Sequence, residues 1–313
     1  MKITLGYFGS PDFSSYFLEK ILNDQDLKKI IDVKLIITQP DRPVGRKQIL
    51  TPTPVAQIGK KYNLEVLKID NLKLFKNLKL KIKNLDLAFV YAFSQIIPKE
   101  LLEVPKYGFW NLHPSLLPKY RGPSPIAFPL ILGEEKTGVT IIKMDEKIDH
   151  GPIIAQKSLT IEDTDRRPDL EKKLTDLGFE IFKKLILTGL NQLKLKKQDD
   201  NKATYTRLLK KQDGFIDFLT LKKVLNNKPL RPEDLPKIIK NLKLKIKNSS
   251  KIIYDYFRGL YPWPGLWTIL PNGKRLKITD VAFVDNKLIL KKVQLEGKNI
   301  VDFETFQQAY NLF

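Results

Sequence analysis

The 313-residue chain carries 55 lysine and arginine residues against 35 aspartate and glutamate residues, a net charge of +20, and 42% of it is hydrophobic. It contains no cysteine and two histidines, which excludes disulfides, thiolate zinc sites, iron–sulfur clusters, a cysteine nucleophile and any three-histidine metal site. The length suggests two domains with sizeable cores, and no apolar run approaches the roughly 20 residues of a membrane span.

The first residues predict a buried strand over 2–8. A signal peptide would need a basic segment, a long apolar segment and a small-residue cleavage site, and this pattern is missing. We therefore expect a cytoplasmic protein that has no membrane partner.

Apolar periodicity predicts that strands and helices alternate along the first 91 residues. The predicted strands are 2–8, 33–37, 64–67 and 85–91, and the predicted helices are 13–22, 54–62 and 72–82. Such alternation indicates an α/β fold, in which crossover helices join the strands of a parallel sheet. Ligands of such sheets bind outside the carboxyl ends of the strands.

A proline-rich segment, residues 39–54, follows the second predicted strand. Its four prolines and one glycine predict that no regular structure runs across it. Loops of this length inside compact domains are usually functional or disordered. We expect Arg42, Arg46 and Lys47 to place three cations at its tip, although ordinary solvated loop charges would look the same in the sequence.

The remaining pattern predicts how the domains divide. A long helix over 165–188 closes a first domain, 1–188; a polar linker covers 189–208, and a second domain covers 209–313. The second domain contains short predicted strands at 266–270, 275–283 and 287–293, a spacing typical of a small β-barrel.

The charge is concentrated in the second part of the chain. Residues 1–200 carry 33 basic and 25 acidic residues, a net +8, whereas residues 201–313 carry 22 and 10, a net +12. A positive field of this kind concentrates polyanions such as nucleic acid. A lysine-rich organism with solvated surfaces would produce the same composition, so charge alone leaves both interpretations open.

One constellation suits acyl-type transfer to an amine. Asn111 and His113 are two residues apart on a predicted extended segment, so both side chains face the same way, and Asp149 lies in a turn before Gly151-Pro152. An amide can donate to an oxyanion, an imidazole can move a proton near neutral pH, and a carboxylate can orient the imidazole. No serine or cysteine nucleophile is needed if the amine attacks directly.

The same residues have plain structural interpretations. An isolated Asn-x-His pair is more often structural than catalytic, and an aspartate beside Gly-Pro is usually a turn residue. From the pair alone, catalysis is the minority interpretation.

Several segments together resemble the methionyl-tRNA formyltransferases, a branch of the folate-dependent formyltransferases. The resemblance covers nearly the whole chain. It is carried by residues 8–13, 38–46, 50–55, 111–122, 138–141, Arg258, 261–265 and 296–298. The Asn-x-His, Ser-Leu-Leu-Pro and Asp-x-Gly-Pro set indicates the reaction type, whereas the loop around Arg42 and the basic second half favour a tRNA acceptor.

The resemblance implies a Rossmann-like N-terminal domain and a C-terminal barrel similar to the oligonucleotide-binding fold. It implies 10-formyltetrahydrofolate as formyl donor and initiator methionyl-tRNA as acceptor. From the absence of cysteine and the two histidines we expect no metal, and we expect a monomer. Asn111 and His113 would stabilise the oxyanion, and Asp149 would pair with His113. The backbone of Ser115, Leu116, Leu117 and Pro118 would line the folate site, and Arg42, Arg46 and Lys47 would contact the tRNA.

Four features depart from the family pattern. Ser94 stands where glycine is usual and Ser10 where threonine is usual. His150 stands where small residues are common, and we expect it to face solvent. The stretch 235–251, with six lysines and no acid, makes the region before Arg258 longer than usual, and we favour an added tRNA contact there over a surface decoration.

Two other functions remain open at this point. One is a formyltransferase for another amine, such as glycinamide ribonucleotide or an amino sugar, which would not need the Arg42 cations. The other is a non-catalytic RNA-binding protein on the same scaffold, which the presence of Asn111, His113 and Asp149 disfavours.

Overall fold

The computed structural model describes residues 2–45, 47–72, 77–240 and 248–313. The chain forms two compact units. The first comprises Met1–Pro125, Thr137–Leu159 and Glu171–Thr206, and the second comprises Ile126–Lys136, Thr160–Leu170 and Arg207–Phe313. The predicted functional domains, 1–188 and 209–313 with a linker at 189–208, stay a prediction.

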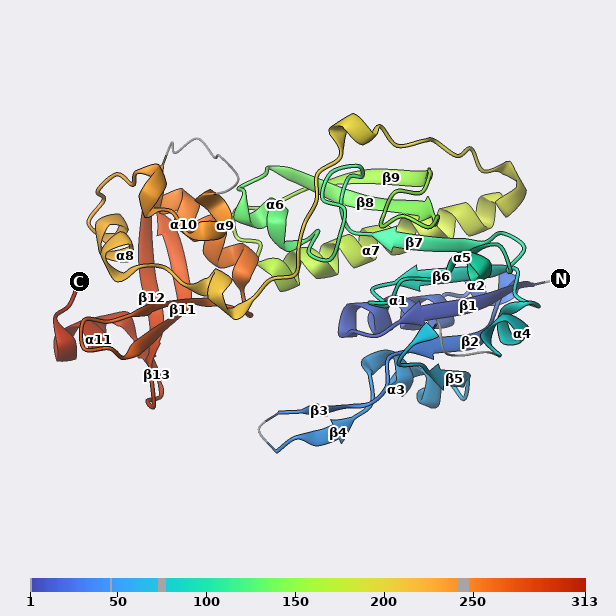
Figure 1. Ribbon diagram of the computed structural model, residues 1–313, viewed down its shortest axis with the longest axis horizontal. Coiled ribbons are helices and arrows are strands. Elements are labelled where there is room, and N and C mark those ends of the chain that lie inside the picture. Colours follow the sequence, from blue (N-terminus) through green and yellow to red (C-terminus); the bar gives the residue numbers. More distant parts are fainter. Residues whose placement is uncertain (1, 46, 73–76, 241–247) are drawn as a thin grey trace. The chain divides into compact units, whose positions relative to one another are not determined.

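The first unit is built on a seven-stranded sheet with the order β5-β2-β1-β6-β7-β8-β9 (Figure 1). Its strands are β1 (Ile3–Gly9), β2 (Ile31–Thr38), β5 (Glu65–Lys68), β6 (Leu87–Tyr91), β7 (Phe109–His113), β8 (Lys136–Lys143) and β9 (Ile153–Thr160). The pairings from β5 to β7 are parallel, and β8 runs antiparallel to β7. The predicted α/β fold with a mainly parallel sheet is therefore confirmed.

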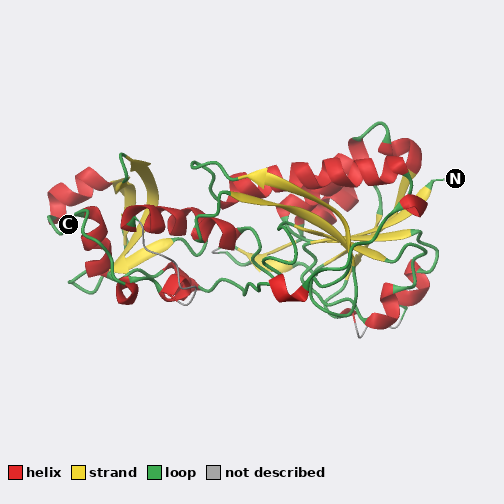
Figure 2. Ribbon diagram, turned by 90° about the horizontal axis from the view of Figure 1, so that it is seen from above, coloured by secondary structure: helices red, strands yellow, loops and turns green. Residues whose placement is uncertain are grey.

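Helices cover both faces of this sheet (Figure 2). They are α1 (Asp12–Asn23), α2 (Leu27–Ile30), α3 (Pro54–Lys61), α4 (Leu78–Ile82), α5 (Lys99–Leu102) and α7 (Arg167–Thr188), with short 3₁₀ turns η2 (Leu190–Gln192) and η3 (Asp200–Lys202).

The two faces have separate apolar cores, because neighbouring residues of a strand point to opposite sides. Phe17 of α1 stacks on Phe89 of β6 and meets Phe182 of α7 edge-on, which places α1 and α7 on one face. Phe8 and Val90 point to the other face, where they join buried residues of α4 and α5.

The strand order reverses beside β1. The chain moves outward from β1 to β2 and β5 and then returns to β6 on the other side of β1. Such a switch point, at the carboxyl ends of parallel strands, is where doubly wound folds bind ligands. His113, the last residue of β7, lies at this edge of the sheet.

The prediction that no regular structure crosses residues 39–54 is wrong. The segment forms a β-ribbon from β3 (Arg42–Val44) and β4 (Ile49–Thr51) that extends from the rest of the unit (Figure 1). Each strand of a two-stranded ribbon has a free edge, so the N–H that Pro43 lacks is not needed for pairing. Arg42 pairs with Thr51 at the base of the ribbon and not at its tip.

The second unit holds an antiparallel sheet with the order β10-β11-β12-β13. Its strands are β10 (Leu266–Ile269), β11 (Arg275–Val284), β12 (Lys287–Leu295) and β13 (Ile300–Asp302). Its helices are α6 (Ala127–Ile131), α8 (Phe218–Leu225), α9 (Lys237–Lys240), α10 (Ser249–Leu260) and α11 (Phe303–Tyr310), with 3₁₀ turns η4 (Lys211–Gly214) and η5 (Pro232–Asp234). The three predicted strands are present as β10, β11 and β12.

Arg258 of α10 is buried and holds the early segment of this unit to the helix. Arg258 and Asp255 are both buried, and the Arg258 Nη2 lies 2.6 Å from the Asp255 Oδ1. The Arg258 Nη1 also donates to the main-chain oxygens of Glu162 and Asp165.

Of the lysine-rich stretch 235–251, residues 241–247 lie outside the described residues.

Candidate functional site

The candidate site begins on β7, where Asn111 and His113 lie on the same side of the strand. His113 is buried and Asn111 is partly exposed. Apolar residues alternate with them along the strand. Trp110 and Leu112 point into the core, where Leu112 contacts Gly178 of α7, so Asn111 and His113 face the other way. The predicted shared orientation of the amide and the imidazole is confirmed.

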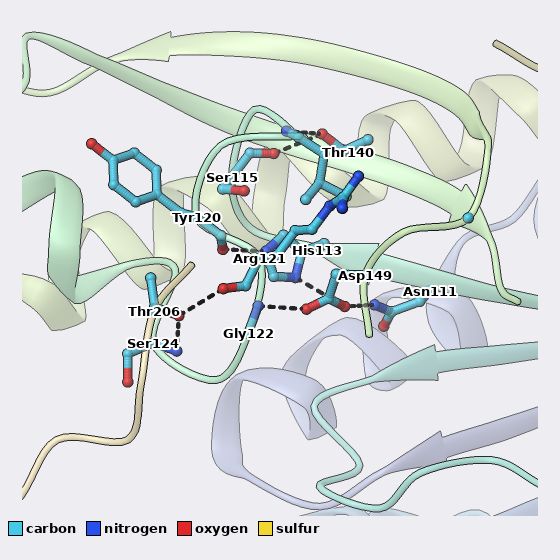
Figure 3. A network of polar contacts seen from close by, with 12 residues as sticks. Asn111, His113, Ser115, Tyr120, Arg121, Gly122, Ser124, Thr140, Asp149 and Thr206 are labelled. Atoms are coloured by element: carbon cyan, nitrogen blue, oxygen red, sulfur yellow. Dashed lines mark hydrogen bonds and ion pairs between the residues drawn. The ribbon is translucent and has the colours of Figure 1, made fainter. Parts of the chain in front are cut away.

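Asp149 brings a carboxylate to both side chains, although it lies more than 35 residues further along the chain (Figure 3). Its Oδ1 accepts from the Asn111 Nδ2 at 3.3 Å and lies 3.5 Å from the His113 Nδ1. Its Oδ2 accepts from the main-chain N–H of Gly122 at 2.7 Å. One carboxylate thus ties the strand to the loop that follows it.

The loop between His113 and Gly122 folds back over the histidine. The main-chain oxygen of Tyr120 lies 2.9 Å from the His113 Nε2. Tyr120 has φ +62° and Gly122 has φ +102°, both in the left-handed region. A larger residue would not fit at position 122, because a Cβ there would meet the main-chain oxygen of Thr206 at 2.8 Å. The conformation of the loop points the Gly122 N–H at the Asp149 carboxylate.

Both ring nitrogens of His113 therefore face oxygens. A neutral imidazole has a single N–H, so it can donate to only one of the two, whereas an imidazolium donates to both. The ring is held between a carboxylate and a main-chain oxygen at the carboxyl end of a strand. An amide donor, an imidazole and a carboxylate within hydrogen-bonding reach can stabilise a developing oxyanion and move a proton.

The turn Ser115–Pro118 follows directly and is held by side chains of neighbouring strands. Thr140 of β8 donates its hydroxyl to the Ser115 main-chain oxygen at 2.7 Å and accepts from the Leu117 N–H at 3.2 Å. Gln156 of β9 donates to the Leu117 main-chain oxygen at 2.9 Å. Each of these carbonyl oxygens has capacity for a second hydrogen bond. Side chains of two neighbouring strands thus hold the backbone of the turn in place.

An outer layer of polar contacts surrounds Asp149. Arg121 is almost fully buried, and its guanidinium donates to the Gln198 Oε1 at 2.8 Å and to the Asp200 Oδ1 at 2.8 Å. The hydrogen bond from Arg121 holds the pKa of Asp200 below its usual range. The residues 198–206 that carry these contacts belong to the segment predicted as a linker.

The expectation that His150 faces solvent is wrong. Its Nδ1 lies 2.6 Å from the Asp145 Oδ2, its Nε2 lies 3.3 Å from the Asp200 Oδ2, and its side chain is 21% exposed. Both ring nitrogens thus face carboxylate oxygens of the protein. His150 therefore joins the loop of Asp149 to Asp200.

Arg42 and Lys47, two of the three residues predicted to contact tRNA, are apart from this cluster, on the β3–β4 ribbon. Arg42 and Lys47 are exposed, and the Arg42 Nη2 donates to the Gln39 Oε1 at 3.2 Å. Arg46 lies outside the described residues. The ribbon also exposes Val44, Ile49 and Leu50, whose side chains are more than half accessible. It is a protruding surface with both cationic and apolar groups.

Ser94 keeps the backbone conformation that a glycine would favour. It follows β6 at the same edge of the sheet and has φ +66°. A non-glycine residue in the left-handed region costs about 1 kcal/mol, so Ser94 adds backbone strain to this turn. Ser10 hydrogen-bonds to Thr38 and to the N–H of Gln39, which ties the first two strands together at this edge.

Sequence reasoning missed Gln156 and Gln198. Arg121, Gly122 and Thr140 stood within the quoted motifs but were assigned no role there. A polar residue flanked by buried positions of β8 would have marked Thr140, but Gln198 lies in a polar, lysine-rich segment that offers no such contrast.

Metal ions and membranes are the two other kinds of partner that the described residues can be compared with. Within residues 2–45, 47–72, 77–240 and 248–313, no group of three or more histidine, aspartate or glutamate side chains could hold a metal ion. The helices in the described part of the chain are also too short or too polar to cross a membrane.

Known proteins resemble this chain in sequence. Residues 4–186 match the model of the Formyl transferase family. A methionyl-tRNA formyltransferase of Caldicellulosiruptor saccharolyticus is 40% identical, over 98% of this chain and 96% of its own. A methionyl-tRNA formyltransferase of Staphylococcus aureus is 35% identical, over 90% of this chain and 80% of its own.

Solved structures share the fold at lower identity. A 4-N formyltransferase from Francisella tularensis has a TM-score of 0.62 at 22% identity, covering 89% of this chain and 97% of its own. A sugar 3N-formyltransferase, solved in the presence of dTDP and 5-N-formyl-THF, has a TM-score of 0.61 at 22% identity, covering 96% and 100%. At this identity the likeness concerns the fold alone.

Proposed function

The chain belongs to the methionyl-tRNA formyltransferase family and is a formyl-transferring enzyme, and from this premise we propose that it formylates methionyl initiator tRNA with 10-formyltetrahydrofolate as donor. The chemistry of the proposal rests on the convergence of Asn111, His113 and Asp149 at the carboxyl end of β7. The choice of acceptor rests on the similarity to named methionyl-tRNA formyltransferases along nearly the whole chain. We also propose that it acts in the cytoplasm, as a monomer and without a metal.

The proposed reaction is direct attack by the methionyl amine. A bond forms between the amine nitrogen and the formyl carbon, the bond from that carbon to the donor nitrogen breaks, and the proton that the amine loses ends on the donor nitrogen. Negative charge develops on the formyl oxygen before the second bond breaks. Hydrogen-bond donors placed at that oxygen lower the barrier, because the charge is larger in the transition state than in the substrate.

Each residue of the cluster has a role in this proposal. Asn111 donates its amide N–H to the developing oxyanion. His113 exchanges the main-chain oxygen of Tyr120, its partner in the absence of substrate, for the more negative oxyanion. Asp149 holds the imidazole in place and stabilises its protonated form while the amine gives up its proton. The Ser115–Pro118 turn would hold the pterin edge of the donor beside them.

One assay tests the function. The purified protein is incubated with 10-formyltetrahydrofolate and methionine-charged initiator tRNA, and the product is analysed for N-formylmethionine. Parallel reactions offer glycinamide ribonucleotide and an amino-sugar nucleotide as acceptors. Formylation of one of these in place of the tRNA would overturn the proposed acceptor, and no product with any acceptor would overturn the proposed enzyme activity.

The ribbon residue Arg42 provides a prediction about the acceptor. Changing Arg42 to alanine is expected to lower kcat/KM for charged tRNA about tenfold or more, since a hydrogen bond from a cation to phosphate is worth about 1.5–3 kcal/mol. Affinity for the formyl donor should change by less than about twofold, because the ribbon is apart from the Ser115–Pro118 turn. Steady-state kinetics and donor titration measure both quantities.

The matched control for this prediction is Lys60→Ala, which removes an exposed cation from α3 near the ribbon. It should leave tRNA kinetics near those of the parent protein. Equal losses in tRNA turnover and donor affinity for Arg42→Ala would contradict an acceptor-binding role.

Salt dependence tests the electrostatic part of the proposal. The +12 charge of residues 201–313 should make tRNA binding weaken by at least about tenfold between 50 and 200 mM salt, since each neutralised phosphate releases counterions. Filter binding or fluorescence anisotropy at several salt concentrations gives the slope. An affinity that does not depend on salt would show that the basic half takes no part in tRNA binding.

A further inference from the structure

Gln198 is a buried polar side chain from the segment that the sequence predicted as a linker. It is 6% exposed. Its Nε2 donates to the main-chain oxygens of Asp149 at 2.9 Å and Gly151 at 2.8 Å. Its Oε1 accepts from the Arg121 Nε at 3.1 Å and Nη2 at 2.8 Å. All four hydrogen-bonding positions of the amide are therefore used.

These partners leave the amide a single orientation. A flipped amide would turn its N–H groups toward the Arg121 guanidinium, which only donates, and its oxygen toward two carbonyl oxygens, which only accept. Gln198 thus accepts hydrogen bonds from a cation on one side and donates to main-chain oxygens on the other. Few other side chains of this size combine a double acceptor with a double donor.

The main-chain oxygen that Gln198 holds belongs to a residue in an unusual conformation. Asp149 has φ +49°, in the left-handed region that L residues rarely adopt. In this conformation its carboxylate reaches Gly122, Asn111 and His113. Strained backbone persists only where the surroundings hold it, and the hydrogen bonds at the Asp149 and Gly151 oxygens are among the contacts that hold it here.

Gln198 is itself fixed from both sides within the first unit. The neighbouring Lys196 pairs with Ile153 through two main-chain hydrogen bonds of 2.7 and 2.8 Å. On the other side, Arg121 is bound by the main chain of Thr204 and Thr206. The amide therefore acts as a brace between two anchored segments and the loop of Asp149.

We propose that Gln198 is a positioning residue for formyl transfer, which keeps the Asp149 carboxylate aimed at His113 by holding the main chain of Asp149 and Gly151. The inference rests on the proposed function, in which Asp149 serves the transition state. It assigns part of the active centre to the segment 196–206 and not only to the β7 and β8 loops.

The test compares a substitution that breaks only the donor half of the amide with one that removes both halves. Gln198→Glu keeps the shape and the acceptor for Arg121 but places an oxygen against the Asp149 and Gly151 oxygens. Gln198→Met removes both halves. If Gln198 positions Asp149, kcat for formyl transfer should fall about tenfold to hundredfold in both variants, because small misplacements of reacting groups carry losses of that size. KM for the donor and for charged tRNA should stay within about threefold.

A merely structural tie to Arg121 gives a different result. In that case Gln198→Glu would keep near-normal kcat while Gln198→Met would lose stability and activity together, and this outcome would overturn the proposal. The matched control is Gln192→Glu, which introduces the same charge at an exposed position of the same segment. It should leave kcat unchanged.

A second measurement does not depend on activity. A crystal structure of Gln198→Glu should show Asp149 relaxed from its left-handed conformation and its carboxylate withdrawn from the Gly122 N–H. An unchanged Asp149 would overturn the inference even if the variant were inactive. A parent protein that makes no N-formylmethionine would refute the proposed function instead, and the crystal structure would still decide the role of Gln198.

Discussion

Replacing His113 with alanine is expected to lower kcat for formyl transfer by about 10²–10³-fold, the loss usually found when one oxyanion donor is removed. The imidazole is buried between the Asp149 carboxylate and the Tyr120 main-chain oxygen, so no neighbouring side chain of the described cluster replaces it. Single-turnover kinetics with charged tRNA measure the effect. Affinity for tRNA and for the donor should change little, because the contact strengthens in the transition state.

The buried position of His113 requires a control for folding. A truncation at a 4% exposed site leaves a cavity, so thermal unfolding of the variant is measured alongside activity. His113→Gln, which fills more of the space, should be as inactive as the alanine variant but more stable. Combining Asn111→Ala with His113→Ala should cost less than the two separate losses multiplied, since residues that act together are not additive. Near-normal turnover of His113→Ala would remove the histidine from the mechanism.

The central sheet could be predicted because its signal is local. Ile3–Gly9, Ile31–Thr38 and Leu87–Tyr91 are short, mainly apolar strands with most of their residues buried, and the helices between them repeat their apolar residues every three to four positions. The ends of these strands lay within about two residues of the prediction. Of the predicted helix 72–82, Leu78–Ile82 is helical, and residues 73–76 lie outside the described residues. The antiparallel direction of β8 was not predictable, because pairing direction depends on partners distant in sequence.

The β3–β4 ribbon shows where local rules mislead. Proline density argued against any strand in residues 39–54, yet a proline interrupts a sheet only where its missing N–H is needed. A ribbon of two short strands has free edges on both sides, so Pro43 fits in it. Arg42 was predicted at the tip of an irregular loop, but it lies at the base of a ribbon.

The inner part of the candidate site could be predicted, and its supports could not. Asn111 and His113 share a strand, so spacing alone shows that they face the same way. The contacts of Asp149 with Gly122, and of Gln198 with Asp149, join positions 27 and 49 residues apart through a fold that periodicity does not encode. Gln198 lies among lysines and other polar residues, so its burial leaves no trace in the pattern.

Changing Asp149 to asparagine is expected to lower kcat by about 10³-fold while the protein stays folded. Three groups converge on the carboxylate: the Gly122 N–H, the Asn111 amide and the His113 Nδ1, which donates when it carries a proton. Asparagine has one acceptor oxygen where aspartate has two, so its own N–H₂ must face one of these donors. If the oxygen stays at Gly122, the amide faces His113 and favours the imidazole tautomer without a proton on Nδ1, and tautomer errors of this kind cost about 10⁴-fold in the serine proteases.

The size of the loss and the split between kcat and KM decide what Asp149 does. A transition-state role predicts a fall in kcat with nearly unchanged affinity for donor and tRNA, because asparagine preserves the volume and the contact with Gly122. A collapse of the loop predicts instead that affinity for both substrates and the melting temperature fall with kcat, and this result would contradict the proposed mechanism. Glu146→Gln removes one charge from the same loop, at an exposed side chain paired with Lys99, and should stay within about threefold of the parent protein if surface charge alone is of little consequence.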